Sequence, residues 1–213
     1  MTLPQVSIVC TDPSHPVNPW LERWAAANAQ RAAISIHRDI ASLGQGDFLF
    51  LVSCQQIVRP ALRARFRHTL VLHGSDLPRG RGMSPHIWQV LEGANSITIT
   101  LLNAADAVDC GDIWHQVVVP LNGTELHAEF HAKLSAAQDE LLSWALDHCD
   151  RSTPRPQVGE PTFYRRRSPE DSRIDPARPL AEAFDLLRVA DPERYPVFFD
   201  HRGQRWRLRL DRL

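Results

Sequence analysis

Short apolar runs alternate with helical patterns along the first 150 residues of the chain. Three of the runs are continuous and apolar, which is typical of strands buried on both faces of a sheet: Gln5–Cys10, Gly46–Cys54 and Thr69–His73. Three further segments have strand character because β-branched residues are frequent in them: 34–40, 95–104 and 112–121. Together these segments predict a buried sheet.

Helical patterns fill several of the gaps between the strands. Residues 19–33 begin with a proline, residues 84–93 end on a glycine, and residues 124–149 form a long amphipathic stretch with Thr124 as the expected N-cap. Strands that alternate with helices predict an α/β fold, in which helices flank a mostly parallel, twisted sheet.

The last third of the chain has a different composition. Residues 150–179 are rich in proline and charge, which indicates a linker or an ordered arm rather than core. A helix over residues 180–191 and a terminal hairpin turning at Arg202-Gly203 are expected after it. We therefore expect a main domain over residues 1–150, with an arm, helix and hairpin over residues 151–213 packed on it.

Charge and cysteine content exclude several classes of function. The chain has 213 residues, 43% of them hydrophobic and 23% charged, and its net charge of −1 gives no sign of a nucleic-acid-binding face. Its four cysteines lie far apart, so no metal-ligand spacing is present and no metal is expected. The N-terminal residues do not resemble a signal peptide and no segment approaches a membrane span, so we expect a cytoplasmic protein.

Polar groups at strand ends are the main candidates for chemistry. Ligands of parallel sheets bind at the carboxyl ends of the strands, where Cys54, His73 and the loop after Leu102 are expected. His73 precedes a loop of glycines and arginines, and could either bond a reacting group or satisfy a local carbonyl.

The acidic loop after Leu102 can likewise be interpreted as functional or as purely structural. Asp106, Asp109 and Asp112 could be held close for proton transfer or form a solvated turn, and the combination with the histidine loop favours function. A nucleophilic Cys110 is the weaker alternative, since lone cysteines are usually small buried residues.

Two further motifs have ordinary explanations. HAEFH (His127–His131) is similar to a zinc-peptidase helix only superficially, because Glu129 faces away, so an exposed helix face is expected. YRRRSPEDSR (Tyr164–Arg173) could clamp a phosphate or form a solvated arm, and the residues alone leave both open.

Two stretches, LHGSDLPRGRGMSPHIWQVLEG and SITITLLNAADAVDCGDI, resemble the signature of the formyltransferases that use 10-formyl-tetrahydrofolate. The matching positions are His73, Ser75–Pro78, Arg81-Gly82, Pro85 with Trp88, and Asp109–Asp112. The start CTDPSHPVNPW and the arginine-rich tail look most like the short sugar N-formyltransferases of nucleotide-sugar pathways, including the pseudaminic-acid type. The resemblance implies a Rossmann-like formyltransferase fold, with a catalytic domain over residues 1–150.

The resemblance also implies a mechanism. A formyl group passes from 10-formyl-tetrahydrofolate, a cosubstrate, to a primary amine, most readily on an amino sugar or nucleotide-linked amino sugar. His73 would bond the developing oxyanion and Asp109 would orient His73 and help take the amine's proton.

The binding residues follow from the same resemblance. The folate would contact Cys54, Gln55, Gln56, Ile57, Arg81, Gly82, Ala105, Asp106, Ala107 and Val108, and the acceptor would contact Ser75, Trp88, Tyr164 and Arg166. No nucleic acid or membrane partner is expected. The terminal hairpin could pair with a second copy of the chain, so a homodimer is an open alternative.

One position departs from the family pattern. The family's asparagine would fall at Val71, which cannot donate a hydrogen bond, and loss of such an oxyanion donor costs about 2.7–4 kcal/mol in other enzymes. A non-catalytic family member is therefore an alternative. A formyl-tetrahydrofolate hydrolase, and a transferase whose acceptor is an amino acid or hydroxamate precursor, are separate alternatives.

Overall fold

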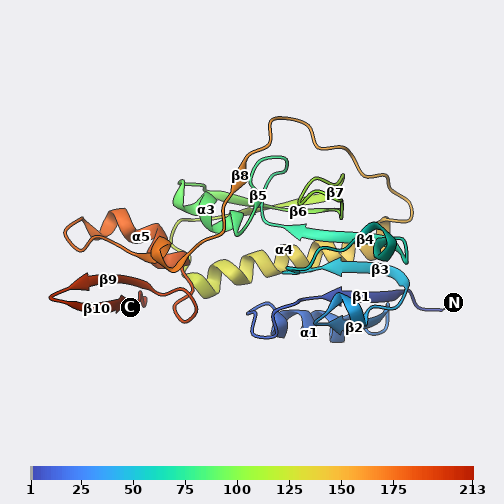
Figure 1. Cartoon of the computed structure of the whole chain (residues 1–213), viewed down its shortest axis with the longest axis horizontal. Coiled ribbons are helices and arrows are strands. Elements are labelled where there is room, and N and C mark those ends of the chain that lie inside the picture. Colours follow the sequence, from blue (N-terminus) through green and yellow to red (C-terminus); the bar gives the residue numbers. More distant parts are fainter. Residues whose placement is uncertain (1) are drawn as a thin grey trace.

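A six-stranded sheet forms the centre of the computed structural model, which describes residues 2–213 (Figure 1). Its strand order is β2-β1-β3-β4-β6-β7. The strands are β1 (Gln5–Val9), β2 (Ala33–His37), β3 (Gly46–Leu51), β4 (Phe66–His73), β6 (Ser96–Asn103) and β7 (Ile113–Pro120). All six segments predicted as strands therefore form strands.

One strand, β6, runs opposite to the other five strands of the sheet. β1 pairs in parallel with β2 and β3, and β3 pairs in parallel with β4, whereas β6 runs antiparallel to both β4 and β7. The sheet is thus mainly parallel, as the sequence predicts.

Helices cover one face of the sheet, and short elements cover the other. Alternate residues of β3 show the division, because Phe48 and Phe50 join the main core whereas Leu49 and Leu51 join a second cluster. The main core is closed by α1 (Asn18–Ala27), α3 (Pro85–Leu91) and α4 (His127–His148). Loops, η1 (Ile40–Ser42) and α2 (Pro60–Arg63) cover the second cluster.

Helix α4 begins later than predicted. The expected N-cap, Thr124, lies before the helix, and its hydroxyl donates to Asn122. The cap residue is Leu126, whose backbone amide donates to Glu129. Glu125, buried beside Lys133, draws the intervening residues into a separate turn by accepting the backbone amides of Asn122 and Gly123.

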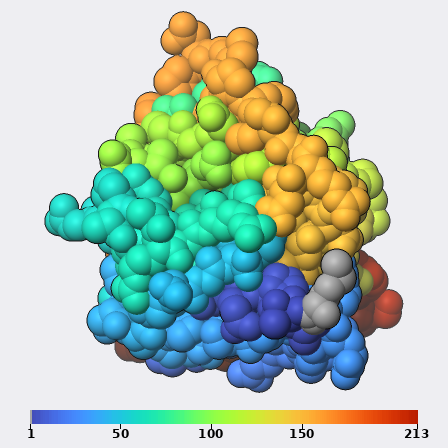
Figure 2. All heavy atoms as spheres, turned by 90° about the vertical axis from the view of Figure 1, so that its right-hand side faces the viewer, coloured from blue at the N-terminus to red at the C-terminus, as the bar shows by residue number. Residues whose placement is uncertain are grey.

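The C-terminal third is an ordered arm followed by a small helical and hairpin unit. In the arm, β8 (Phe163–Tyr164) pairs in parallel with β5 (Arg81–Gly82), and η2 spans Pro169–Ser172. Helix α5 (Leu180–Val189) lies against α3 and α4, and β9 (Val197–His201) and β10 (Gln204–Leu208) form the predicted antiparallel hairpin. Figure 2 shows the orange arm residues lying over the green part of the molecule.

The turn of this hairpin fits its local sequence. Arg202 and Gly203 both have positive φ, +52° and +75°, as the two-residue hairpin turn requires. Within residues 2–213 no helix is both long and apolar enough to cross a membrane.

Candidate active site

His73 is the last residue of β4 and its ring is buried, with 7% of the residue exposed. Side chains alternate along a strand, so His73 shares a face of the sheet with Val71. Val71 packs against Leu77, Leu102 and Ile113 on that face. The sheet thus presents an imidazole next to an apolar wall.

Asp109 approaches His73 from the loop between β6 and β7. The carboxylate Oδ1 lies 3.5 Å from His73 Nδ1, and both side chains are 8% exposed. The Oδ2 atom accepts the backbone amide of Gly82 at 2.9 Å. The two distant loops singled out in the sequence therefore meet at one buried contact.

The other ring nitrogen of His73 has a backbone partner. His73 Nε2 lies 2.8 Å from the Gly80 carbonyl, and since a carbonyl can only accept, Nε2 carries a proton and donates it. The histidine therefore satisfies a local carbonyl, the ordinary alternative, and contacts the acid as well. Each ring nitrogen faces a different loop.

The Asp109 loop reaches His73 by a route that the sequence did not predict. β6 is antiparallel, so its last residue, Asn103, lies beside Leu70 inside the sheet rather than at the carboxyl edge of the parallel strands. The loop then folds back toward His73. A left-handed Asp109 (φ +56°) makes this turn, and a Cβ at Gly111 would lie 1.8 Å from the Asn103 carbonyl oxygen.

The three acids of this loop have separate surroundings, so the predicted carboxylate cluster is wrong. Only Asp109 is buried against His73, whereas Asp106 pairs with Arg63 at 2.6 Å and Asp112 is exposed. The Cys110 thiol donates to the Val108 carbonyl. Within residues 2–213 no hydrogen bond joins Cys110 to His73. Backbone direction, which the local pattern does not encode, decides which acid turns inward.

Ser75 lies behind the histidine loop. It is 1% exposed, its carbonyl accepts the Thr100 hydroxyl at 2.6 Å, and its own hydroxyl is buried without a hydrogen-bond partner. A Cβ at Gly80 would lie 2.8 Å from Ser75 Cβ, so glycine allows this loop to fold closely over the serine. Ser75 therefore supports the loop from below.

The remaining residues predicted for the acceptor gather on the arm and α3. The Trp88 ring stacks with that of Tyr164 at 6.2 Å, and the Arg165 guanidinium lies 4.8 Å from the Trp88 ring. Burial and the hydrogen bond to Glu92 raise the pKa of Tyr164 to about 12.

The arginines of the arm differ in what they contact. Arg165 pairs with Asp171, and Arg167 donates to Ser172. Arg166 is exposed, and no ion pair within residues 2–213 uses its guanidinium. Of the three, Arg166 therefore has a cation free to meet a ligand.

The residues predicted to hold the folate form two groups. Arg81 and Gly82 lie in β5 beside Asp109, as described above. The others follow β3 and β6 on the face of the second cluster, and they are mostly exposed: Cys54, Gln55, Gln56 and Ile57, and Ala105, Asp106, Ala107 and Val108. Cys54 and Ala104 pack on the same apolar cluster as Val71, so the two segments flank one face. We name residues 54–57 and 105–108 the exposed strip.

A side chain that the sequence analysis did not select occupies the centre of this arrangement. Gln157, on the arm, donates to the carbonyls of Asp109 and Gly111 at 2.8 Å each and accepts from Arg81 at 2.6 Å. No local sequence signal marks Gln157, because its partners lie more than 40 residues away.

His127 and His131 do not form the expected exposed helix face. Both are half-buried, their ring centroids lie 4.4 Å apart, and the His131 ring lies 5.8 Å from that of His86. Burial and neighbouring imidazoles lower the pKa of His86 to about 3 and that of His131 to about 4. Glu129 instead pairs with Arg212, consistent with its predicted direction away from the histidines.

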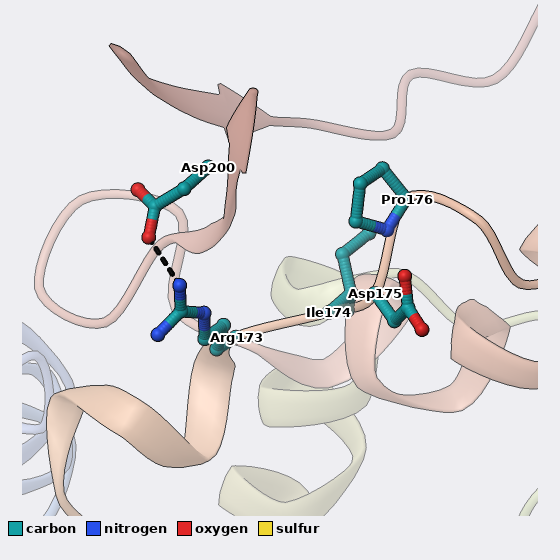
Figure 3. A pocket seen from close by; sticks show the side chains of 5 residues that line it. All are labelled: Arg173, Ile174, Asp175, Pro176 and Asp200. Carbon is teal, nitrogen blue, oxygen red and sulfur yellow. Dashed lines mark hydrogen bonds and ion pairs between the residues drawn. The ribbon is translucent and has the colours of Figure 1, made fainter. Parts of the chain in front are cut away.

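Two hollows of the surface lie elsewhere. One, of about 310 Å³, is lined by Arg173, Ile174, Asp175, Pro176 and Asp200, and Figure 3 shows Arg173 paired with Asp200 at its wall. The other, of about 670 Å³, runs between α1 and α4. Within residues 2–213 no group of three or more His, Cys, Asp or Glu side chains has an arrangement that could hold a metal ion.

Comparison with solved structures shows the same fold in several proteins. Methionyl-tRNA formyltransferase from Clostridium thermocellum matches with a TM-score of 0.81 and 23% identity over 99% of this chain and 94% of that one. A sugar N-formyltransferase from Shewanella matches with a TM-score of 0.70 and 15% identity, covering 97% of this chain and 96% of the other.

HypX from Aquifex aeolicus, in complex with tetrahydrofolic acid, matches with a TM-score of 0.82 and 17% identity over 98% of this chain. The present chain spans 38% of the HypX chain. At these identities the three likenesses show the fold. The model of the formyl transferase family matches residues 11–146, most of the chain, and the chain therefore belongs to the formyl transferase family.

Proposed function

We propose that this formyl-transfer enzyme takes the formyl group from 10-formyl-tetrahydrofolate and passes it to the primary amine of an amino sugar, most readily a nucleotide-linked one. The observation that carries this proposal is the buried contact of His73 with Asp109, between loops that lie 36 residues apart in the chain. An imidazole held by a carboxylate in a water-poor site is suited to bond a carbonyl oxygen and manage a proton.

The exposed strip is suited to a flat, polar donor. No hydrogen bond within residues 2–213 uses the backbone amides of Gln56, Ile57 or Ala105–Val108, so these groups are available to a ligand. Apolar side chains lie beside them, since Ile57 is 70% exposed and Val108 is 67% exposed. Free amides beside apolar surface match a heterocycle whose edge is polar and whose faces are apolar.

His73 and Asp109 have different roles in the proposed reaction. The bound folate would supply the formyl carbonyl group and the nitrogen that leaves. His73 Nε2–H, which donates to the Gly80 carbonyl in this structure, donates to the formyl oxygen once the Gly80 turn moves aside. Asp109 lies against Nδ1 of the imidazole and accepts the proton of the attacking amine, directly or through water. That proton then passes to the folate nitrogen as its bond to the formyl carbon breaks and the new amide bond is complete.

The arm supports the choice of acceptor. Arg166 has no carboxylate partner among the ion pairs of residues 2–213. Its neighbours Arg165 and Arg167 place their guanidinium groups over the Trp88 ring, which stacks with Tyr164. A guanidinium beside aromatic rings is suited to the phosphates and the ring of a nucleotide. The sugar amine would then reach the His73–Asp109 pair with its carrier on the arm.

The decisive experiment is incubation of the protein with 10-formyl-tetrahydrofolate and a panel of amino-sugar nucleotides, amino sugars and amino acids. Mass detection should show a formyl gain on a sugar amine. His73→Ala should lower this turnover at least about 100-fold, because a positioned acid–base group contributes that much or more. His201→Ala, a change in an exposed histidine of the hairpin, is the matched control and should leave turnover unchanged.

Two other outcomes would replace this proposal. Formate release at the same rate without any amine would indicate a hydrolase. An inert wild type that stays inert after Val71→Asn would indicate a non-catalytic member, which the apolar surroundings of Val71 favour as the second candidate. A gain of turnover on Val71→Asn would instead show that the missing donor limits an existing enzyme.

A further inference from the structure

The arm crosses the candidate site and is attached on both sides of it. At one end, Arg155 and Ile113 exchange backbone hydrogen bonds of 2.7 and 2.8 Å. At the other end, Thr162 and Tyr164 accept the backbone amides of Arg81 and Met83. The intervening residues therefore have a fixed path over the loops that carry Asp109 and Gly82.

Gln157 is the inward-facing residue of this crossing. Its neighbours Pro156 and Val158 are exposed, the latter 81%, whereas Gln157 is half-buried. Both donors and the acceptor of its amide are used: Nε2 donates to Asp109 and Gly111, and Oε1 accepts from Arg81. A glutamine can offer two N–H donors and one carbonyl, so this side chain is fully satisfied by the site.

These contacts hold the part of the Asp109 loop whose backbone conformation is energetically least favourable. Asp109 has a left-handed backbone, which a non-glycine residue adopts at a cost, and the loop must keep its carboxylate against His73. The backbone of Asp109 is held by Gln157 and its side chain by the Gly82 amide. Gln157 also holds Arg81, the residue before Gly82, so one amide ties together the two loops that position the acid.

We propose that Gln157 is a positioning residue, which sets the orientation of the Asp109 carboxylate toward His73 by bridging the Asp109 loop and the Arg81-Gly82 strand. This inference rests on the proposed function for its kinetic consequence. Its structural content, the coupling of Gln157 to the His73–Asp109 pair, stands apart from the identity of the substrates.

The test uses Gln157→Glu and Gln157→Met in the full chain. The glutamate keeps the length and the acceptor for Arg81 but removes both donors to the loop, and the methionine keeps only the volume. With the acceptor that the substrate panel identifies, each variant should lower kcat about 10- to 100-fold, because a small misplacement of a reacting group costs rate in that range. The KM for the formyl donor should stay within about threefold, since misorientation affects the chemical step more than binding. Val158→Ala is the matched control and should change neither constant.

A second measurement does not need turnover. The nitrogen resonances of the His73 imidazole should shift in both Gln157 variants and not in Val158→Ala. Lowered thermal stability with unchanged His73 resonances and unchanged kcat would reduce Gln157 to a structural contact and overturn the proposal. An inert wild type in which the Gln157 variants still shift the His73 resonances would refute the proposed function and leave this inference standing.

Discussion

The two halves of the candidate site differ in how much of their geometry exists before a ligand binds. His73 and Asp109 are buried, each side chain 8% exposed, and each is held by further hydrogen bonds to the Gly80–Gly82 segment. The exposed strip has the opposite character, with free amides and side chains as open as Ile57 at 70% and Val108 at 67%. The fold thus sets the His73–Asp109 contact before any ligand binds and leaves only the Gly80 turn to be displaced from His73, whereas the strip proposed for the donor is open to solvent.

This difference follows from what each half must do. A group that stabilises a developing charge works best when its position needs no change during the reaction. A binding surface can exchange water for ligand, and solvent satisfies its backbone in the meantime. Substitutions should therefore affect folding and catalysis together in the first half and binding alone in the second.

Gly111→Ala should give the largest effect. The new Cβ would lie 1.8 Å from the Asn103 carbonyl oxygen, and because this obstructing atom belongs to the backbone of β6 it cannot move aside as a flexible side chain could. We expect a loss of about 1–3 kcal/mol in the free energy of unfolding, typical of overpacking, or more, together with loss of the His73–Asp109 contact. Urea unfolding and formyl transfer would measure both.

Gly44→Ala is the control for this change, because nothing lies within 4 Å of a Cβ at Gly44. If Gly111→Ala were as stable and active as Gly44→Ala, the Asp109 loop would not be held as tightly as the first half of the comparison requires.

Acid should give the next largest effect, on the stability of the whole fold, through two histidines of α3 and α4 that lie outside both halves of the site. The pKa of His86 is lowered to about 3 and that of His131 to about 4, mainly by burial, against an ordinary value of 6.5. The unfolded chain therefore binds more protons below pH 6.5, and the free energy of unfolding falls as the pH falls from 6.5 toward 4. Each histidine contributes up to about 1.4 kcal/mol per pH unit.

Urea unfolding at pH 7 and pH 5 measures this slope, since the carboxylates are largely ionised in both states over that interval. His131→Gln should reduce the pH dependence, and His201→Gln, an exposed histidine, should not. Equal slopes in all three proteins would contradict the enclosed packing of His86 and His131.

Changes in the exposed strip should have the smallest effect on folding. Ile57→Ser and Val108→Ser remove apolar surface that is already in water, so the free energy of unfolding should change by less than about 0.5 kcal/mol. If the donor lies on this strip, its KM should rise several-fold while kcat stays near the wild-type value.

Val118→Ser, an equally exposed position on β7, is the control and should leave the KM unchanged. A loss of stability in the strip variants, or an unchanged KM beside a working enzyme, would show that the strip is not the open binding surface of the comparison.

Local patterns in the amino-acid sequence were enough to predict the strands, the hairpin turn and the family. Apolar runs predicted three of the six strands and β-branched segments predicted the other three, and Arg202-Gly203 predicted the hairpin turn. The ordered motif from His73 to Asp112 indicated the family, which the family model over residues 11–146 confirms. Such features are encoded within a few residues or in a fixed order, because backbone geometry and motif chemistry act locally.

The contacts between distant side chains could not be predicted in this way, because they depend on how the elements pack. The antiparallel direction of β6 sends its loop back over the sheet, so Asp109 reaches His73 while Asp106 pairs with Arg63 and Asp112 faces water. The arm turns Gln157 onto that loop from 48 residues away. Strand direction and the path of an arm depend on packing between distant segments, and no periodicity within a single segment records them.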